Sequence, residues 1–106
     1  METVHLVVKG KVQGVFYRAS AKEVALQNGI TGWIKNNKEG DVEAMITGTD
    51  EQVEKFTNWC RQGPPKAMVD EVTITPKEQM HFNKFDIIRF SFFNFLRDVH
   101  ILMRLQ

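Results

Sequence analysis

The chain has little cysteine, little net charge and no long apolar run, and each shortage excludes a class of protein. Its one cysteine, Cys60, cannot form an intrachain disulfide, which is consistent with a reducing cytoplasm. The formal net charge of +1 is too small for general nucleic-acid binding. No stretch approaches the roughly 20 apolar residues that span a bilayer, and "METVHLVV" lacks the features of a signal peptide. We therefore expect a cytoplasmic protein without nucleic-acid or membrane partners.

Metal ligands and cofactor motifs are also scarce. His5, His81 and His100 stand at no metal-ligand spacing to one another or to Cys60. Neither a P-loop nor a dinucleotide fingerprint occurs in the glycine-containing stretch "GKVQGVFYRAS". We therefore predict no metal site and no cofactor, and we expect Cys60 to be a partly buried helix residue.

What the sequence does contain is enough strands and helices for one domain. Its 106 residues, 42% hydrophobic and 25% charged, have the composition of an ordinary globular protein. The patterns predict strands over 3–10, 30–36, 41–48, 68–76 and 84–90, and helices over 18–29 and 49–63. This order predicts an α+β, ferredoxin-like βαββαβ sandwich, with two helices on one face of an antiparallel sheet and a short fifth strand.

The turn between the first strand and the first helix has the composition of an anion site. Gly10 and Gly14 allow the backbone to curl so that successive N–H groups form a concave set of donors. Arg18, close to the first helical turn, can donate two hydrogen bonds to a phosphate, which a lysine cannot do with the same geometry. The alternative is a turn that only reverses the chain, with a solvated arginine.

The predicted topology brings a second polar residue to this turn. In a split βαβ unit the first two strands run parallel with the third between them, so both end at one edge of the sheet. Lys35 and Asn36 stand at the end of the second strand. The amide of Asn36 can hold a water molecule in line with a bound phosphorus atom. The alternative is a turn-forming role in "KNNKEG".

Two segments, "VKGKVQGVFYR" and "GWIKNNKEGDVEAMITG", resemble the signature segments of the acylphosphatases, and the resemblance extends from about Val4 to about Arg89. The matching positions are Gly10, Val12, Gln13, Gly14, Val15, Arg18, Gly32, Trp33, Lys35, Asn36, Gly40, Val42 and Gly48. Tyr17 and Ile34 depart from the usual pattern, which has phenylalanine or methionine at the first position and valine or alanine at the second. Neither departure touches the chemistry that the resemblance implies.

The resemblance implies a ferredoxin-like fold and metal-free hydrolysis of the carboxyl-phosphate bond of acyl phosphates, with water as the nucleophile. It makes Arg18 the phosphate-binding residue and Asn36 the residue that positions water. The phosphate cradle would be the backbone of Val12, Gln13, Gly14, Val15, Phe16 and Tyr17 together with Arg18. A small acyl phosphate is the expected partner, and inorganic phosphate or another small anion can bind the same loop. The sequence does not choose among acyl groups.

Two other functions fit the same fold class. Ferredoxin-like sheets bind RNA through aromatic residues on exposed strands, but the predicted strands carry Trp33 without an aromatic cluster. A regulatory module would bind phosphate or a small anion without hydrolysing a substrate. Release of phosphate from an acyl phosphate distinguishes the enzyme from both.

We expect a domain over residues 1–90 followed by a C-terminal extension over 91–106, where the resemblance ends. The extension carries apolar residues at nearly helical spacing, interrupted by charges: Phe92, Phe95, Leu96, Val99, Leu102 and Met103. Three alternatives stay open: packing on the domain's own surface, a dimer contact, or a disordered extension. A monomer is expected, with a dimer through the extension as the alternative.

Overall fold

The computed structural model describes residues 1–89, and its elements follow the predicted order. They are β1 (Glu2–Lys11), α1 (Tyr17–Gln27), β2 (Thr31–Asn36), β3 (Val42–Gly48), α2 (Asp50–Gln62), β4 (Met68–Lys77) and β5 (Phe85–Ile88). Each lies within a few residues of its predicted range. The prediction of a ferredoxin-like sandwich is confirmed.

The five strands form one sheet in the order β4-β1-β3-β2-β5. β3 pairs antiparallel with both β1 and β2, so β1 and β2 run parallel to each other and end at the same edge. β5 pairs parallel with β2, which makes the sheet mixed rather than wholly antiparallel. β4 is antiparallel to β1 and therefore also to β2. Because the chain reverses direction between β4 and β5, β5 runs parallel to β2.

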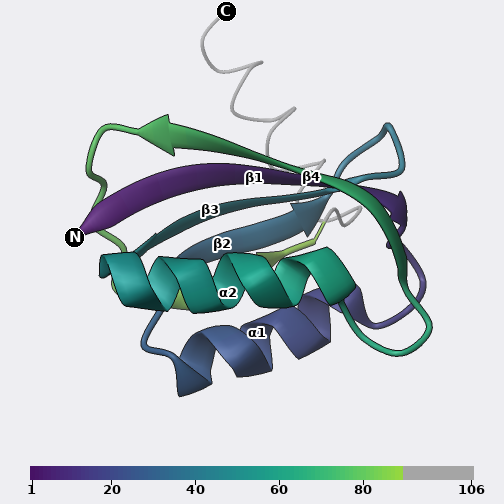
Figure 1. The fold of residues 1–106 in the computed structure, drawn as a ribbon, viewed down its shortest axis with the longest axis horizontal. Coiled ribbons are helices and arrows are strands. Elements are labelled where there is room, and N and C mark those ends of the chain that lie inside the picture. Colours follow the sequence, from purple (N-terminus) through teal and green to yellow (C-terminus); the bar gives the residue numbers. More distant parts are fainter. Residues whose placement is uncertain (90–106) are drawn as a thin grey trace, which may run out of the picture.

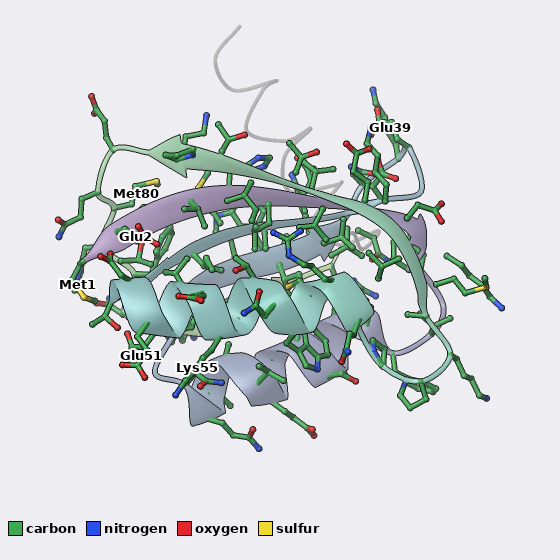
Figure 2. The ribbon with its side chains drawn as sticks, viewed as in Figure 1. Met1, Glu2, Glu39, Glu51, Lys55 and Met80 are labelled. Atoms are coloured by element: carbon green, nitrogen blue, oxygen red, sulfur yellow. The ribbon has the colours of Figure 1, made fainter. Side chains whose placement is uncertain are left out.

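Both helices cover the same face of the sheet (Figure 1). The side chains of β1 alternate accordingly, with Val4, Leu6 and Val8 buried beneath the helices. Phe56 of α2 and Phe85 of β5 complete this core with ring centroids 6.0 Å apart. The outer face of α2 is polar, and its exposed Glu51 and Lys55 form an ion pair of 3.3 Å (Figure 2). The core thus fixes the relative positions of the strand ends that carry the candidate site.

The two helices begin in different ways. Thr49 caps α2: its hydroxyl accepts from the Gln52 backbone N–H, and the Gln52 side chain accepts from the Thr49 N–H in return. Asp50 and Glu51 add negative charge to this first turn. At α1 the capping position is occupied by Phe16, which has no side-chain acceptor, and the first turn has no acidic residue. The N-terminus of α1 is therefore the end at which an external anion can satisfy the helix donors.

Residues 90–106 lie outside the described part of the chain, so the predicted extension over 91–106 and its boundary stay predictions. Neither helix within residues 1–89 is long and apolar enough to cross a membrane.

Candidate active site

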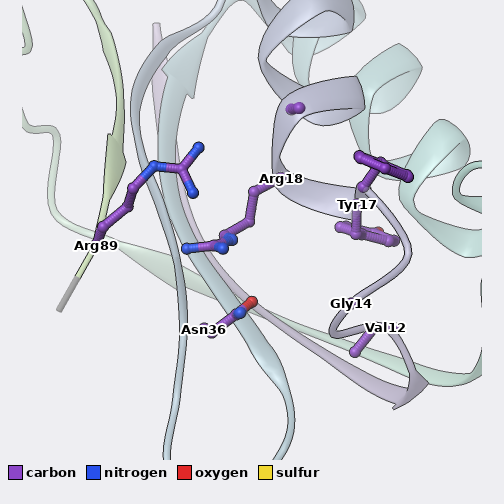
Figure 3. A pocket seen from close by; sticks show the side chains of 8 residues that line it. Val12, Gly14, Tyr17, Arg18, Asn36 and Arg89 are labelled. Atoms are coloured by element: carbon purple, nitrogen blue, oxygen red, sulfur yellow. The ribbon is translucent and has the colours of Figure 1, made fainter.

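A pocket of about 340 Å³ lies at the shared edge of the sheet, between the end of β1, the start of α1 and the end of β2 (Figure 3). Its described lining consists of Val12, Gly14, Phe16, Tyr17, Arg18, Ala19, Asn36 and Arg89. It contains Arg18 and Asn36 together, as the topology predicted. Five of the seven residues predicted for the phosphate cradle line it, whereas Gln13 and Val15 do not.

The loop between β1 and α1 curls because two alternate residues adopt left-handed backbone angles. Gly14 has φ 75° and Phe16 has φ 64°, and Phe16 is the one non-glycine residue with positive φ among residues 1–89. Alternation of this kind turns successive N–H groups toward one side of the loop. Gly10 has a different role: a Cβ there would overlap the carbonyl oxygen of Met68 in β4. The sheet, rather than the loop, requires glycine at position 10.

Arg18 extends from the first turn of α1 into the pocket, and Arg89 extends toward it from just beyond β5 (Figure 3). Partial burial lowers the pKa of Arg18 from its usual value, and the positive charge of Arg89 adds to this shift. An arginine stays protonated even so. Two guanidinium groups therefore line this pocket.

The sequence did not indicate Arg89 as a site residue. It follows the short last strand and stands in no glycine-rich or turn-forming context. Its proximity to Asn36 depends on the parallel pairing of β5 with β2, in which Ile88 lies opposite Lys35. The sequence had predicted a short fifth strand in an antiparallel sheet, and not its parallel pairing with β2.

Asn36 is the last residue of β2 and presents its amide to the pocket, on the same side as the Arg18 guanidinium (Figure 3). Its Oδ1 atom is buried and has no hydrogen-bond partner within the part of the chain that is described. A buried acceptor without a partner is costly, so such atoms generally mark a bound water or ligand.

Gln13 ties the loop to the β2–β3 hairpin. Its Nε2 donates to the carbonyl oxygens of Asn37 at 2.9 Å and Asp41 at 2.8 Å. The Oδ1 of Asn37 in turn accepts from the Asp41 N–H at 2.9 Å, which closes the hairpin. Since Asn37 directly follows Asn36, the Gln13 amide fixes the distance between the loop and Asn36.

The lining contains one hydroxyl and no thiol, carboxylate or imidazole among the described residues. That hydroxyl belongs to Tyr17 and is occupied, because it donates to the carbonyl oxygen of Cys60 at 2.8 Å. Burial, and to a lesser extent the neighbouring Cys60, raise the pKa of the Tyr17 phenol well above its usual value of 10. Tyr17 is therefore unsuited to act as a nucleophile.

Cys60 lies in α2 at 1% exposure, more deeply buried than predicted, and burial raises the pKa of its thiol to about 12. An unfolded thiol loses its proton above a pKa of 9.0, whereas the folded one keeps it. The folded state thus holds more protons as the pH rises, so stability falls in that range.

We expect this thiol to produce an alkaline loss of stability. Between about pH 8 and about pH 10 the free energy of unfolding should fall by about 1 kcal/mol more in the wild type than in Cys60→Ala. Urea unfolding at both pH values measures the difference. An equal fall in the free energy of unfolding of the two proteins would show that the thiol has the same pKa in the folded and the unfolded state.

Within residues 1–89, no group of three or more His, Cys, Asp or Glu side chains is arranged to hold a metal ion.

The fold and the pocket define a class: a small ferredoxin-like domain with a glycine-containing loop and arginine side chains at one edge of its sheet. The family model for acylphosphatase matches residues 4–87. An acylphosphatase from Bordetella parapertussis is 48% identical over 86 residues, which cover 77% of this chain and 92% of the relative. The chain belongs to the acylphosphatase family, and it is accordingly a hydrolase with acylphosphatase activity.

Solved structures agree with this assignment. An acylphosphatase from Coxiella burnetii superposes with a TM-score of 0.79 at 36% identity, covering 82% of this chain and 92% of that one. An acylphosphatase from Bacillus subtilis gives a TM-score of 0.81 at 27% identity, covering 84% of this chain and 100% of that one. The family prediction made from the two signature segments is confirmed.

Proposed function

We propose that Arg18 and the loop bind the phosphoryl group of a small acyl phosphate and that Asn36 positions the attacking water. The backbone of Val12 through Tyr17, together with the uncapped N-terminus of α1, supplies further donors. The Arg18 guanidinium matches two phosphoryl oxygens and carries the counter-charge. Inorganic phosphate, as the product, occupies the same donors.

Hydrolysis then needs alignment more than acid–base chemistry. Water held by Asn36 attacks the phosphorus, a new P–O bond forms, and the bond to the acyl oxygen breaks. The carboxylate leaves with the bonding electron pair, and a proton of the water passes to solvent. Because a carboxylate is a good leaving group, positive charge and in-line placement are sufficient.

The observation that carries the proposal is the buried, unpartnered Oδ1 of Asn36 in the same pocket as Arg18. A water molecule can donate one proton to this atom and direct its lone pair at a phosphorus atom held by the arginine. A module that only binds anions has no need for such an acceptor.

The test is release of inorganic phosphate from acetyl phosphate in the presence of a metal chelator. We expect catalytic turnover under these conditions. Binding of phosphate without turnover would favour the regulatory anion-binding module, and turnover that the chelator abolishes would contradict the metal-free mechanism.

Gln13 is proposed as a positioning residue that acts through Asn36. In Gln13→Ala two hydrogen bonds between the loop and the hairpin are lost, which should lower the free energy of unfolding by about 2 kcal/mol. Misplacement of Asn36 should also lower kcat about ten-fold, with a smaller change in KM. Steady-state kinetics and urea unfolding measure the two effects.

Gln27→Ala, at the exposed end of α1, is the matched control and should change neither quantity. A Gln13→Ala variant that loses stability but keeps the wild-type kcat would show that the two hydrogen bonds of the Gln13 side chain stabilise the fold alone.

A further inference from the structure

Phe16 is the most exposed large apolar side chain in the described part of the chain, and it lines the catalytic pocket. Its side chain is 75% exposed, whereas its two neighbours, Val15 and Tyr17, are 4% and 2% exposed. The backbone thus directs one aromatic ring outward between two residues that anchor the loop in the core.

This arrangement has two physical costs. An exposed ring forgoes the favourable burial that an aromatic side chain usually finds. The left-handed conformation, with φ 64° and ψ 26°, is also unfavourable for a residue with a bulky side chain. The curled loop requires that conformation at position 16, but it does not require phenylalanine there. Strained backbone of this kind concentrates at ligand sites.

In-line attack determines where the acyl group of a substrate lies. Water beside Asn36 approaches phosphorus from the buried side of the pocket, so the leaving carboxylate lies on the opposite side of the phosphorus. The acyl group therefore extends toward the exposed wall of the pocket. Phe16 is the one large apolar side chain that the described lining offers to it in exposed form.

We propose that the ring of Phe16 is the acyl-binding surface of this pocket and selects acyl phosphates with apolar, above all aromatic, acyl groups. The inference rests on the proposed function and deepens it by naming the substrate class. An aromatic acyl group stacks on the ring and covers it, whereas a methyl group reaches little of it. The selection appears in kcat/KM because the contact persists while the acyl oxygen departs.

The experiment compares kcat/KM for benzoyl phosphate with kcat/KM for acetyl phosphate, as a ratio, in four proteins. Phe16→Ala should lower the benzoyl-to-acetyl ratio about five-fold, which is the size of one aromatic contact. Phe16→Tyr keeps the ring and should keep the ratio. Leu26→Ala removes an exposed apolar residue of α1, 63% exposed and outside the pocket, and should also leave the ratio as in the wild type.

The outcomes separate this inference from the proposed function. Hydrolysis of both substrates with the same ratio in wild type and Phe16→Ala overturns the acyl-binding role of Phe16 and leaves the proposed function standing. A wild-type protein that releases phosphate from neither substrate overturns the proposed function, and the acyl-binding role falls with it.

Discussion

Arg18→Ala should lower kcat/KM for acetyl phosphate about a thousand-fold. The substitution removes the guanidinium that extends into the pocket and that would hold the phosphoryl oxygens. Charge stabilisation by a single arginine or backbone donor in a phosphoryl or oxyanion site is typically worth this much. Steady-state release of phosphate measures the loss.

Arg18→Lys should have a kcat/KM for acetyl phosphate less than about ten-fold above that of Arg18→Ala. Lysine keeps the charge but presents a single rotatable ammonium, which cannot make the two parallel hydrogen bonds of the guanidinium. Its greater flexibility would also leave the phosphorus less well aligned with the water at Asn36.

The control is Arg61→Ala, which removes an exposed arginine from the last turn of α2 and lowers the net charge by the same amount. This variant should keep wild-type kinetics. If Arg18→Ala hydrolyses acetyl phosphate nearly as fast as the wild type, Arg18 is not the phosphate-binding residue.

Asn36→Ala should lower kcat about a hundred-fold while phosphate affinity stays within about three-fold of the wild type. The reason is the separation of roles: the loop and Arg18 hold the phosphate, and Asn36 holds the water. Competitive inhibition by inorganic phosphate gives the affinity, and saturating acetyl phosphate gives kcat.

Stability provides an independent readout of Asn36. Because its buried Oδ1 lacks a partner in residues 1–89, truncation removes an unsatisfied group and should cost little folding free energy. Asn58→Ala, an exposed position in α2, is the matched control. Weakened phosphate inhibition together with an unchanged kcat would instead assign Asn36 a structural role.

Much of the fold was predictable because local signals agreed with one another. Thr49 or Asp50 as the cap, acidic residues in the first turn, and Gly63 with Pro64 at the end indicated α2. The structure shows that Thr49 is the cap. Alternating apolar residues indicated the strands, and the order of elements then placed β1 and β2 with their ends together. That placement made Asn36 a candidate although it lies 18 residues from Arg18 in the numbering of the chain.

The remaining features depend on contacts that no local pattern encodes. The parallel pairing of β5, and with it the position of Arg89, follows from where the chain crosses after β4. Gln13 was predicted only for its backbone in the phosphate cradle. The role of its side chain could not be predicted, because the two acceptors of that amide belong to a hairpin 24 and 28 residues away. The left-handed backbone of Phe16 could not be predicted either, since phenylalanine disfavours that conformation.

The central claim is that water attacks the phosphorus of an acyl phosphate bound by Arg18 and aligned by Asn36. Hydrolysis of acetyl phosphate by the wild-type protein in ¹⁸O-labelled water tests it most directly, because the label reports which bond breaks. Attack at phosphorus predicts one labelled oxygen in the inorganic phosphate and none in the acetate. Label in the acetate would mean attack at the carbonyl carbon and would contradict the roles assigned to both residues.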